Sequence, residues 1–385
     1  MFVQISGWVI FSIGAIFSVP SLIAMLSRTF IKKTGQCPLL ENVPLVSIII
    51  AARDEEVKIE ETLQSCLSLN YSNYELIVVN DRSTDKTGDM IDQFANKNDR
   101  LKALHVTELP DGWLGKVHAM HLASKAATGE FLLFMDGDIL LHPETVTMAM
   151  QYVVAKELDH LCLFPGTLPG SHIAEEALVA SFGMLFAIGT QPLLVPTSFK
   201  KSYVGIGAFN LVRRTAYNSM GGHEPLKLNI LDDVKLGMLI KRYGFKQDVL
   251  LADKHVKLKW QDSAWGVICG LEKNGFASMN YSFLKMIRFS LYVVIIMMLP
   301  SFVAPFVWNI DGAGFIAAAI LGHLQFAIIG QRLGRGLYLF PLYLFALAGI
   351  LFAFWRSAFI TTRQQGVRWR DTFYSLRDLR NGLMQ

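Results

Sequence analysis

The chain has 385 residues, of which 52% are hydrophobic, and its mean hydropathy is +0.35. This composition excludes a wholly water-soluble enzyme and predicts membrane segments. The net charge of +4 is small for this length, and the sequence has no basic stripe interleaved with aromatics, so we expect no nucleic-acid partner. The four cysteines are scattered without metal-ligand spacing, which is typical of a reducing compartment.

The chain begins with an uncharged apolar run, Phe2 to Leu26, that is long enough to span a bilayer. No basic residue precedes it and no clear cleavage site follows it, so we expect a retained transmembrane anchor over residues 1–27 rather than a signal peptide. Arg28, Lys32 and Lys33 come next, and positive charge beside a span marks the cytoplasmic side. We therefore expect the residues after the anchor to be cytoplasmic.

Three further apolar runs of near-spanning length lie toward the C-terminus: Leu291–Trp308, Gly312–Gly330 and Leu337–Trp355. They predict transmembrane or interfacial helices over 290–356, followed by a basic amphipathic cytoplasmic tail over 357–385. Three crossings would leave that arginine-rich tail outside the cell, against the positive-inside rule. One run therefore lies in the interface or re-enters without crossing, and the first, which contains Pro300 and Pro305, is the best candidate.

Between these ends, short apolar runs alternate with helical patterns. Four of the runs predict buried strands: Leu45–Ala52, Tyr74–Asn80, Leu101–Val106 and Phe131–Met135. Strands that alternate with helices of this length imply right-handed crossovers and a mostly parallel sheet covered on both faces, an α/β fold. In such a sheet, ligands bind outside the carboxyl ends of the strands.

Polar groups follow three of the predicted strands. Arg53 and Glu55 come after the first, Asp81 after the second, and Asp136 and Asp138 after the fourth. Two carboxylates at this spacing can bind a hard divalent cation when substrate phosphates supply the other oxygens. Alone, the segment around Asp136 could equally be a turn after a strand. Three strands that deliver such groups to one edge indicate a nucleotide-type site.

The loop Leu109–Gly115 contains the glycines and proline of an ordinary connection, and that accounts for most of it. Lys116, which follows, is the exception. A cation at a helix start is disfavoured by the helix dipole, so this lysine suggests an anion nearby, and we expect a phosphate.

Two later segments contribute further candidates. Gly205–Arg214 is a glycine-rich turn that enters a short strand, and it lacks the sequence of a P-loop. Asp232 and Asp233 open a helix, where carboxylates are often simple caps but can also accept a proton from an incoming hydroxyl. The pattern is weak over 143–200. Ala174–Ile188 predicts a very apolar helix, explained more commonly by core packing than by a membrane surface or an acceptor groove.

The motifs form an ordered series: Ala52–Glu55, Asn80–Asp85, Gly115–Lys116, Phe134–Asp138 and Leu231–Gly237. This series resembles family 2 glycosyltransferases. The resemblance implies an inverting enzyme with a GT-A domain, Rossmann-like, over 45–285. Membrane-anchored members, including carotenoid- and hopanoid-associated transferases, are most similar in layout, and their loop and tail resemble Gly112–Lys116 and Gly366–Arg370.

The resemblance also implies roles for single residues. Ala51, Arg53 and Glu55 would line the nucleoside pocket of the donor, and Asp81 would hold uracil or an equivalent base.

The remaining roles concern the reacting groups. Asp136 and Asp138 would bind Mn²⁺ or Mg²⁺ at the diphosphate, with Asp138 as the more direct ligand, and Lys116 would share in stabilising the leaving diphosphate. Asp233 would be the general base, with Asp232 beside it in the catalytic motif.

Two departures from the family pattern limit this transfer of roles. Processive members carry a Gln-x-x-Arg-Trp motif, and the corresponding region here is Gly270–Phe276, which favours transfer of a single sugar. It leaves Lys273 as a candidate contact for acceptor or diphosphate. The family more often has Glu at the position of Asp232, a small change that leaves the base assignment intact.

The sequence therefore predicts a multi-pass cell-membrane glycosyltransferase that moves one sugar from a nucleotide-sugar donor, UDP-linked, to a lipid or lipid-linked acceptor at the cytoplasmic face. Two other classes stay open. A non-catalytic membrane assembly protein could keep the fold as a binding platform, although every acidic position is retained. A nucleotidyltransferase would need a glycine-rich, Lys- or Arg-bearing loop after the first strand, which this sequence lacks.

Overall fold

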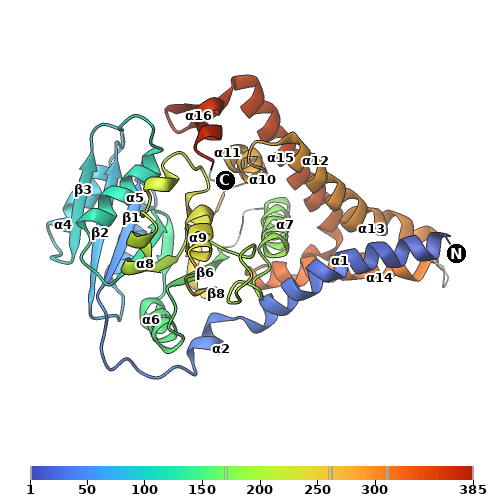
Figure 1. Ribbon diagram of the computed structural model, residues 1–385, viewed down its shortest axis with the longest axis horizontal. Coiled ribbons are helices and arrows are strands. Elements are labelled where there is room, and N and C mark those ends of the chain that lie inside the picture. Colours follow the sequence, from blue (N-terminus) through green and yellow to red (C-terminus); the bar gives the residue numbers. More distant parts are fainter. Residues whose placement is uncertain are drawn as a thin grey trace. The chain divides into compact units, whose positions relative to one another are not determined.

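The computed structural model describes residues 2–168, 170, 172–258, 260–261, 263–308 and 312–383 (Figure 1). Residues 1, 384 and 385, at the ends of the expected anchor and tail, lie outside this set. The chain divides into two compact units. The sheet unit comprises Ser27–Thr167, Leu194–Leu258 and Gly382–Gln385, and the helical unit comprises Met1–Leu26, Leu168–Leu193 and Lys259–Asn381. The domain expected over 45–285 therefore includes residues of both units.

Within the described residues, the main sheet has eight strands in the order β3-β2-β1-β4-β7-β6-β8-β5. The four strands expected from the sequence are confirmed as mutually parallel: β1 (Val46–Ala52), β2 (Tyr74–Asp81), β3 (Leu101–Val106) and β4 (Phe131–Asp136). The expected short strand is β7 (Asn210–Arg213), which pairs antiparallel with β4. The sheet is therefore mostly parallel, as predicted, with an antiparallel insertion next to its central strand.

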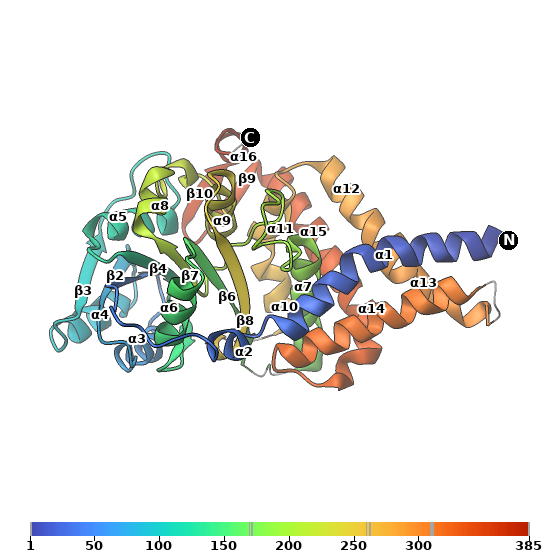
Figure 2. The same ribbon diagram turned by 60° about the horizontal axis from the view of Figure 1, so that its bottom comes forward.

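Three further strands were not expected. They are β5 (Ile139–Leu141), β6 (His160–Thr167) and β8 (Gln247–Leu258). β6 lies beside β8 in parallel, as Figure 2 also shows, and antiparallel to β7. The weakly patterned segment after residue 143 thus contains a helix and a strand, α6 (Thr145–Ala155) and β6.

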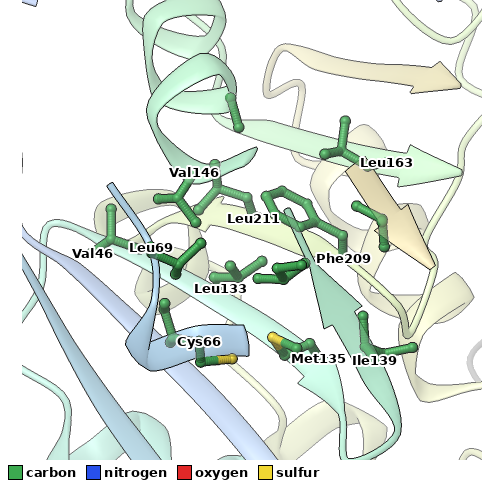
Figure 3. Close-up of a cluster of buried hydrophobic side chains, with 14 of the residues drawn as sticks. Val46, Cys66, Leu69, Leu133, Met135, Ile139, Val146, Leu163, Phe209 and Leu211 are labelled. Carbon is green, nitrogen blue, oxygen red and sulfur yellow. The ribbon is translucent and has the colours of Figure 1, made fainter. Parts of the chain in front are cut away.

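Helices cover both faces of this sheet. On one face, alternate side chains of β1 and β4 join a buried cluster with Cys66 of α3 (Ile59–Leu67) and Val146 of α6; Figure 3 shows Leu133, Met135 and Phe209 within it. On the other face, α5 (Gly115–Ala126) packs against β1 and β2. Burial of each large aliphatic side chain stabilises the fold by about 1.5–3 kcal/mol. The continuous apolar runs in these strands follow from burial on both faces.

The other helices of the sheet unit are short connections. They are α2 (Phe30–Thr34), α4 (Thr87–Ala95), α8 (Arg214–Ser219), the 3₁₀ turn η1 (Glu224–Leu226) and α9 (Asp232–Arg242). The helix expected to open at Asp232 is therefore confirmed as α9, and it packs on β8.

The helical unit contains the apolar runs. Five helices of the described residues are long and apolar enough to cross a membrane, by length and composition: Val3–Ser27, Ile173–Thr190, Phe283–Phe306, Ala313–Arg332 and Leu337–Gln364. Four were expected. The fifth is α7 (Ile173–Thr190), the very apolar helix, and it packs against α14 (Ala313–Arg332) and α15 (Tyr343–Gln364), in agreement with the expectation of core packing.

The first C-terminal apolar run is irregular. It comprises α12 (Phe283–Leu291), a π-helical stretch η2 (Tyr292–Met298), α13 (Leu299–Val303) and the 3₁₀ turn η3 (Ala304–Phe306). Pro300 lies in the first turn of α13. Proline removes a backbone donor, which explains the break in regular helix.

The helical unit also contains the long helix α1 and several short elements. They are α1 (Phe2–Ser27), α10 (Ala264–Gly270), α11 (Glu272–Ser278), η5 (Leu337–Leu342), a hairpin of β9 (Gly366–Trp369) and β10 (Thr372–Ser375), and α16 (Leu376–Asn381). The expected tail over 357–385 thus begins inside α15 and continues as folded structure. Lys273, a candidate acceptor contact, places its ammonium 4.0 Å from the centre of the Trp369 ring.

Candidate active site

The predicted site residues converge at the carboxyl edge of the parallel strands. In the sheet register Ala51 of β1 lies beside Asp136, the last residue of β4, and beside Val79 of β2. Asp81 is the last residue of β2. Because parallel strands end at the same edge, these groups come together as the sequence predicts.

The loop that carries Arg53 and Glu55 is tied to the loop after β2. Asp54 has a φ of 53°, a left-handed conformation that Asp tolerates better than most residues, and its Oδ1 accepts a hydrogen bond from the Thr84 amide at 2.8 Å. The Glu55 amide donates to Oγ1 of Thr87 at 2.8 Å. These bonds join the two loops across 30 and 32 residues of sequence and so fix the backbone of both.

Asp81 is buried and accepts hydrogen bonds from the guanidinium of its neighbour Arg82, at 2.8 Å from Nε to Oδ1. The pair lies against the start of α5. A Cβ added to Gly115 would come within 2.3 Å of Asp81 Oδ2 and 2.5 Å of Arg82 Nη2. Glycine is therefore required at this helix start because the carboxylate and guanidinium already occupy the space.

Lys116 joins carboxylates from two distant segments. Its Nζ lies 2.6 Å from Asp136 Oδ1 and 3.7 Å from Asp232 Oδ2. Burial opposes the lysine charge, but the carboxylates of Asp136, Asp232 and Asp233 outweigh it and raise the pKa of Lys116 above its ordinary value. The structure thus places aspartates beside this lysine, and its contact with a phosphate stays a prediction.

Asp138 follows Asp136 two residues later in the sequence and has a cationic partner of its own. The ammonium of Lys58, at the start of α3, is 3.2 Å from Asp138 Oδ2. Burial raises the pKa of the Asp138 carboxyl, and the charge of Asp136 raises it further, against the effect of Lys58. A nearby cation favours the charged form of a carboxylate in such an environment.

The donor atoms at this strand end fit a hard divalent ion. Asp136 and Asp138 offer carboxylate oxygens, the ligands that Mg²⁺ and Mn²⁺ prefer. Among the residues that the structure describes, no group of three or more His, Cys, Asp or Glu side chains forms a metal site. Two carboxylates alone make an incomplete site, so substrate oxygens would have to complete it.

Gly207 connects the end of β4 to Asp233. Its amide donates to Asp233 Oδ2 at 2.7 Å, and its carbonyl accepts from the Asp136 amide at 2.9 Å. The Val234 amide donates to the other oxygen of Asp233, also at 2.7 Å. Burial raises the pKa of Asp233; Lys116 and the two amide bonds act in the opposite direction, and Asp136 raises it further. Asp233 is thus a fixed carboxylate with raised proton affinity.

The glycine turn packs directly on the backbone of α9. A Cβ on Gly205 would lie 1.7 Å from the Asp233 carbonyl oxygen, and one on Gly237 would lie 1.8 Å from the Val204 carbonyl oxygen. Side chains at these two positions would force the turn and the helix apart. The close approach brings Asp233 to the same edge as Asp136.

Sequence reasoning missed the two residues that hold this arrangement together. Lys58 is 80 residues from its partner Asp138, and its place in an ordinary helix-start sequence gave no signal. Gly207 was noticed only as part of a glycine-rich turn. The signal that could have found it is the pair Gly205 and Gly237, since an isolated glycine within a helical pattern often marks close backbone approach.

These features define a GT-A-type fold whose sheet edge gathers acidic residues. Over residues 47–221 the chain matches the family model described as glycosyl transferase family 2. The predicted resemblance to family 2 glycosyltransferases is thus confirmed over residues 47–221.

Characterised and named relatives agree with this family. The chain is 26% identical over 204 residues to the 4,4'-diaponeurosporenoate glycosyltransferase of Staphylococcus haemolyticus (strain JCSC1435), which covers 52% of this chain and 53% of that protein. It is 36% identical over 117 residues to the probable glycosyltransferase YdaM of Bacillus subtilis (strain 168), or 30% of this chain and 27% of that one. The chain thus spans about half or less of the length of these relatives.

Two further proteins are matched over most of their own length. The UDP-Glc:alpha-D-GlcNAc-diphosphoundecaprenol beta-1,3-glucosyltransferase WfgD of Escherichia coli is 24% identical over 249 residues, 62% of this chain and 90% of that protein. The mannosyltransferase PcManGT of Pyrobaculum calidifontis, solved in complex with GDP-Man and Mn²⁺, superposes with a TM-score of 0.53 at 14% identity, covering 94% of this chain and 99% of that one. This likeness supports the fold.

Proposed function

We propose that the protein transfers a single sugar, with inversion, from a nucleotide-sugar donor to a lipid or lipid-linked acceptor at the cytoplasmic face of the membrane. The observation that carries the proposal is the joining of two acidic segments, from the end of β4 and the start of α9, by Lys116 and Gly207. A nucleotide-sugar donor bound at the sheet edge would lie with its diphosphate near Asp136 and Asp138 and with the acceptor near Asp233.

On the donor side, Ala51, Arg53 and Glu55 would contact the nucleoside, and Asp81 would bind the base. The β1 and β2 loops that carry these groups are cross-linked, which supports a preformed pocket. We infer a UDP-linked donor, as in the name of the Escherichia coli relative, although the similar structure from Pyrobaculum calidifontis holds GDP-Man.

On the acceptor side, Asp233 would act as the general base. Its carboxylate would take the proton of the acceptor hydroxyl while the hydroxyl oxygen attacks the anomeric carbon from the face opposite the leaving group. The bond from that carbon to the nucleotide diphosphate breaks, and the electron pair leaves with the diphosphate. Asp232 would keep Lys116 beside the reacting groups, where the ammonium stabilises the charge on the diphosphate.

Asp136 and Asp138 would hold Mn²⁺ or Mg²⁺. When bound, the ion would supply positive charge to the diphosphate of the donor. The pKa of Asp138, raised by burial, supports a need for such a cation, and the Mn²⁺ in the similar mannosyltransferase structure is consistent with it.

A membrane-embedded acceptor is supported by two observations. Five described helices have the length and composition of membrane spans. The names of two relatives include 4,4'-diaponeurosporenoate and alpha-D-GlcNAc-diphosphoundecaprenol. We therefore place the protein in the cell membrane, with several spans, and include membrane lipid among its partners.

The proposal is tested with the purified full-length protein in detergent or nanodiscs, with Mn²⁺, a panel of nucleotide sugars and an extract of membrane lipids. Wild type should release nucleoside diphosphate and label a lipid, and Asp138→Ala and Asp233→Ala should abolish both. Asp92→Ala, which removes an exposed carboxylate paired with His105, is the matched control and should retain activity. If no donor is consumed, or if all three variants behave alike, the proposal is wrong.

A further inference from the structure

Behind the glycine turn lies a buried cluster of four polar side chains on adjacent strands, which we call the amide network: His160, Cys162, Asn210 and Gln247. All four are at most 1% exposed. In the sheet register His160 pairs with Gln247, and Cys162 pairs with Asn210, so the side chains lie on one face of β6, β7 and β8. None of the four belongs to the site proposed above.

Gln247 connects this network to the turn. Its Oε1 accepts a hydrogen bond from the Val204 amide at 3.1 Å. Its Nε2 lies 3.2 Å from the Val204 carbonyl oxygen, 3.0 Å from the Gly237 carbonyl oxygen and 2.7 Å from His160 Nδ1, so two N–H groups share three acceptors. One side chain therefore binds both backbone groups of the residue before Gly205 and the backbone of α9.

The network is self-consistent in its proton positions. Because His160 Nδ1 accepts from Gln247, the histidine must be neutral with its proton on Nε2, which donates to Asn210 Oδ1. Burial lowers the pKa of His160 to about 4, which keeps it in this neutral form at neutral pH. Cys162 Sγ lies 3.4 Å from the same Asn210 oxygen. A fully satisfied buried network specifies one geometry.

The amide network is connected to Asp233 through the backbone of Val204 and Gly205. Gln247 holds Val204, Gly205 packs on the backbone of Asp233, and Gly207 donates to the Asp233 carboxylate and accepts from the Asp136 amide. Cys162 also lies near enough to Asp233 for the carboxylate to raise the pKa of the thiol, after the larger effect of burial. The amide network thus lies next to Asp233, the proposed base.

We infer that Gln247, supported by His160, is a positioning residue that sets the glycine turn and thereby the orientation of Asp233. The inference rests on the proposed function, since it concerns the base of that reaction. Without the Gln247 side chain, both backbone groups of Val204 and the Gly237 carbonyl lose a partner, and the turn is free to shift away from α9. Asp233 then loses the Gly207 hydrogen bond that favours its charged form.

The test variant is Gln247→Met, which keeps an unbranched side chain of similar length without hydrogen bonds. Hydrogen–deuterium exchange should become faster in peptides covering 204–209 but not in those of β1 and β2. The kcat for sugar transfer should fall by about 10- to 100-fold, while KM for the donor changes by less than about twofold. The acid limb of kcat should move to higher pH, because a base with a higher pKa needs a higher pH to lose its proton.

The control is Tyr152→Phe, which removes a buried hydrogen bond, 2.8 Å long, to Asp248, the residue after Gln247 on β8. Successive side chains of a strand point to opposite faces, so this bond does not belong to the amide network. The variant should leave the exchange of 204–209 and the acid limb unchanged. A second pair covers the case in which Gln247→Met fails to fold. His160→Gln can still accept and donate and should retain activity, whereas His160→Leu should show the faster exchange and the shifted limb.

The outcomes separate this inference from the proposed function. If wild type transfers sugar and Asp233→Ala does not, but Gln247→Met and His160→Leu match wild type in exchange and acid limb, the positioning role is wrong and the proposed function stands. An acid limb that shifts equally in Tyr152→Phe also refutes it. If wild type consumes no donor, the proposed function fails, and the positioning of a base fails with it, whatever the exchange data show.

Discussion

Replacing Gly205 with alanine gives a sharp test of the contact between the glycine turn and α9. The added Cβ would lie 1.7 Å from the Asp233 carbonyl oxygen and 2.3 Å from its carbonyl carbon. Real Cβ contacts are essentially never closer than 3.0 Å, so the two backbones must separate by at least about 1.3 Å, the difference between 3.0 and 1.7 Å. Both partners are main chain, so no flexible side chain can absorb the shift.

A displacement of this size should reduce both activity and stability. Overpacking of this kind lowers the free energy of unfolding by about 1–3 kcal/mol. A 1 Å misplacement of a reacting group can lower the rate about 100-fold, and we expect a loss of that order in kcat. The assays are steady-state transfer kinetics and urea unfolding followed by intrinsic fluorescence.

The control is Gly189→Ala in α7, where an added Cβ has nothing within 4 Å. It should leave kcat unchanged, and the better helix propensity of alanine should not reduce stability. If Gly205→Ala retains wild-type kcat and stability, the turn does not position Asp233 by backbone contact, and the account of this part of the site is wrong.

Three other predictions concern charge. Lys116→Met removes the ammonium 2.6 Å from Asp136 and should move the acid limb of kcat to higher pH, since the nearby base then holds its proton more tightly; an unmoved limb contradicts the pairing. Lys58→Met removes a cation that competes for Asp138, so the Mn²⁺ concentration for half-maximal activity should fall rather than rise. His160 has a pKa of about 4 when folded, against about 6.5 unfolded, so its contribution to stability is fully present above pH 6.5 and should be lost as pH falls to 4, by about 3 kcal/mol. Urea unfolding at several pH values should show a smaller loss in His160→Gln than in wild type, because other buried histidines such as His223, whose pKa burial also lowers, contribute in both proteins.

The parallel half of the sheet could be predicted because its strands are buried on both faces. Runs such as that of β4 are continuously apolar and end in polar residues, so both the strand and the polar edge of the sheet are visible in sequence. The other half could not be predicted in the same way. β6 contains His160, Cys162 and Pro165, and β8 is interrupted by charges, because these strands carry the amide network and form an irregular pairing.

The candidate site, like the sheet, could be predicted only in part. The sequence revealed acidic groups at strand ends because each lies next to a recognisable local pattern. It could not reveal what pairs with them. Lys116 with Asp232 and Lys58 with Asp138 are contacts between distant segments. Gln247 had no local signal, since its partners are His160, which is 87 residues away in sequence, and backbone groups that any sequence would supply.

The most direct test of the central claim is the transfer rate of Asp233→Asn, which keeps the shape of the side chain but cannot accept a proton as a base. The measurement is single-turnover sugar transfer to lipid with a saturating donor, together with donor affinity by calorimetry. We predict that donor affinity stays close to that of wild type and that the transfer rate falls by about 100- to 10,000-fold. Transfer at the wild-type rate would contradict the assignment of Asp233 as the base.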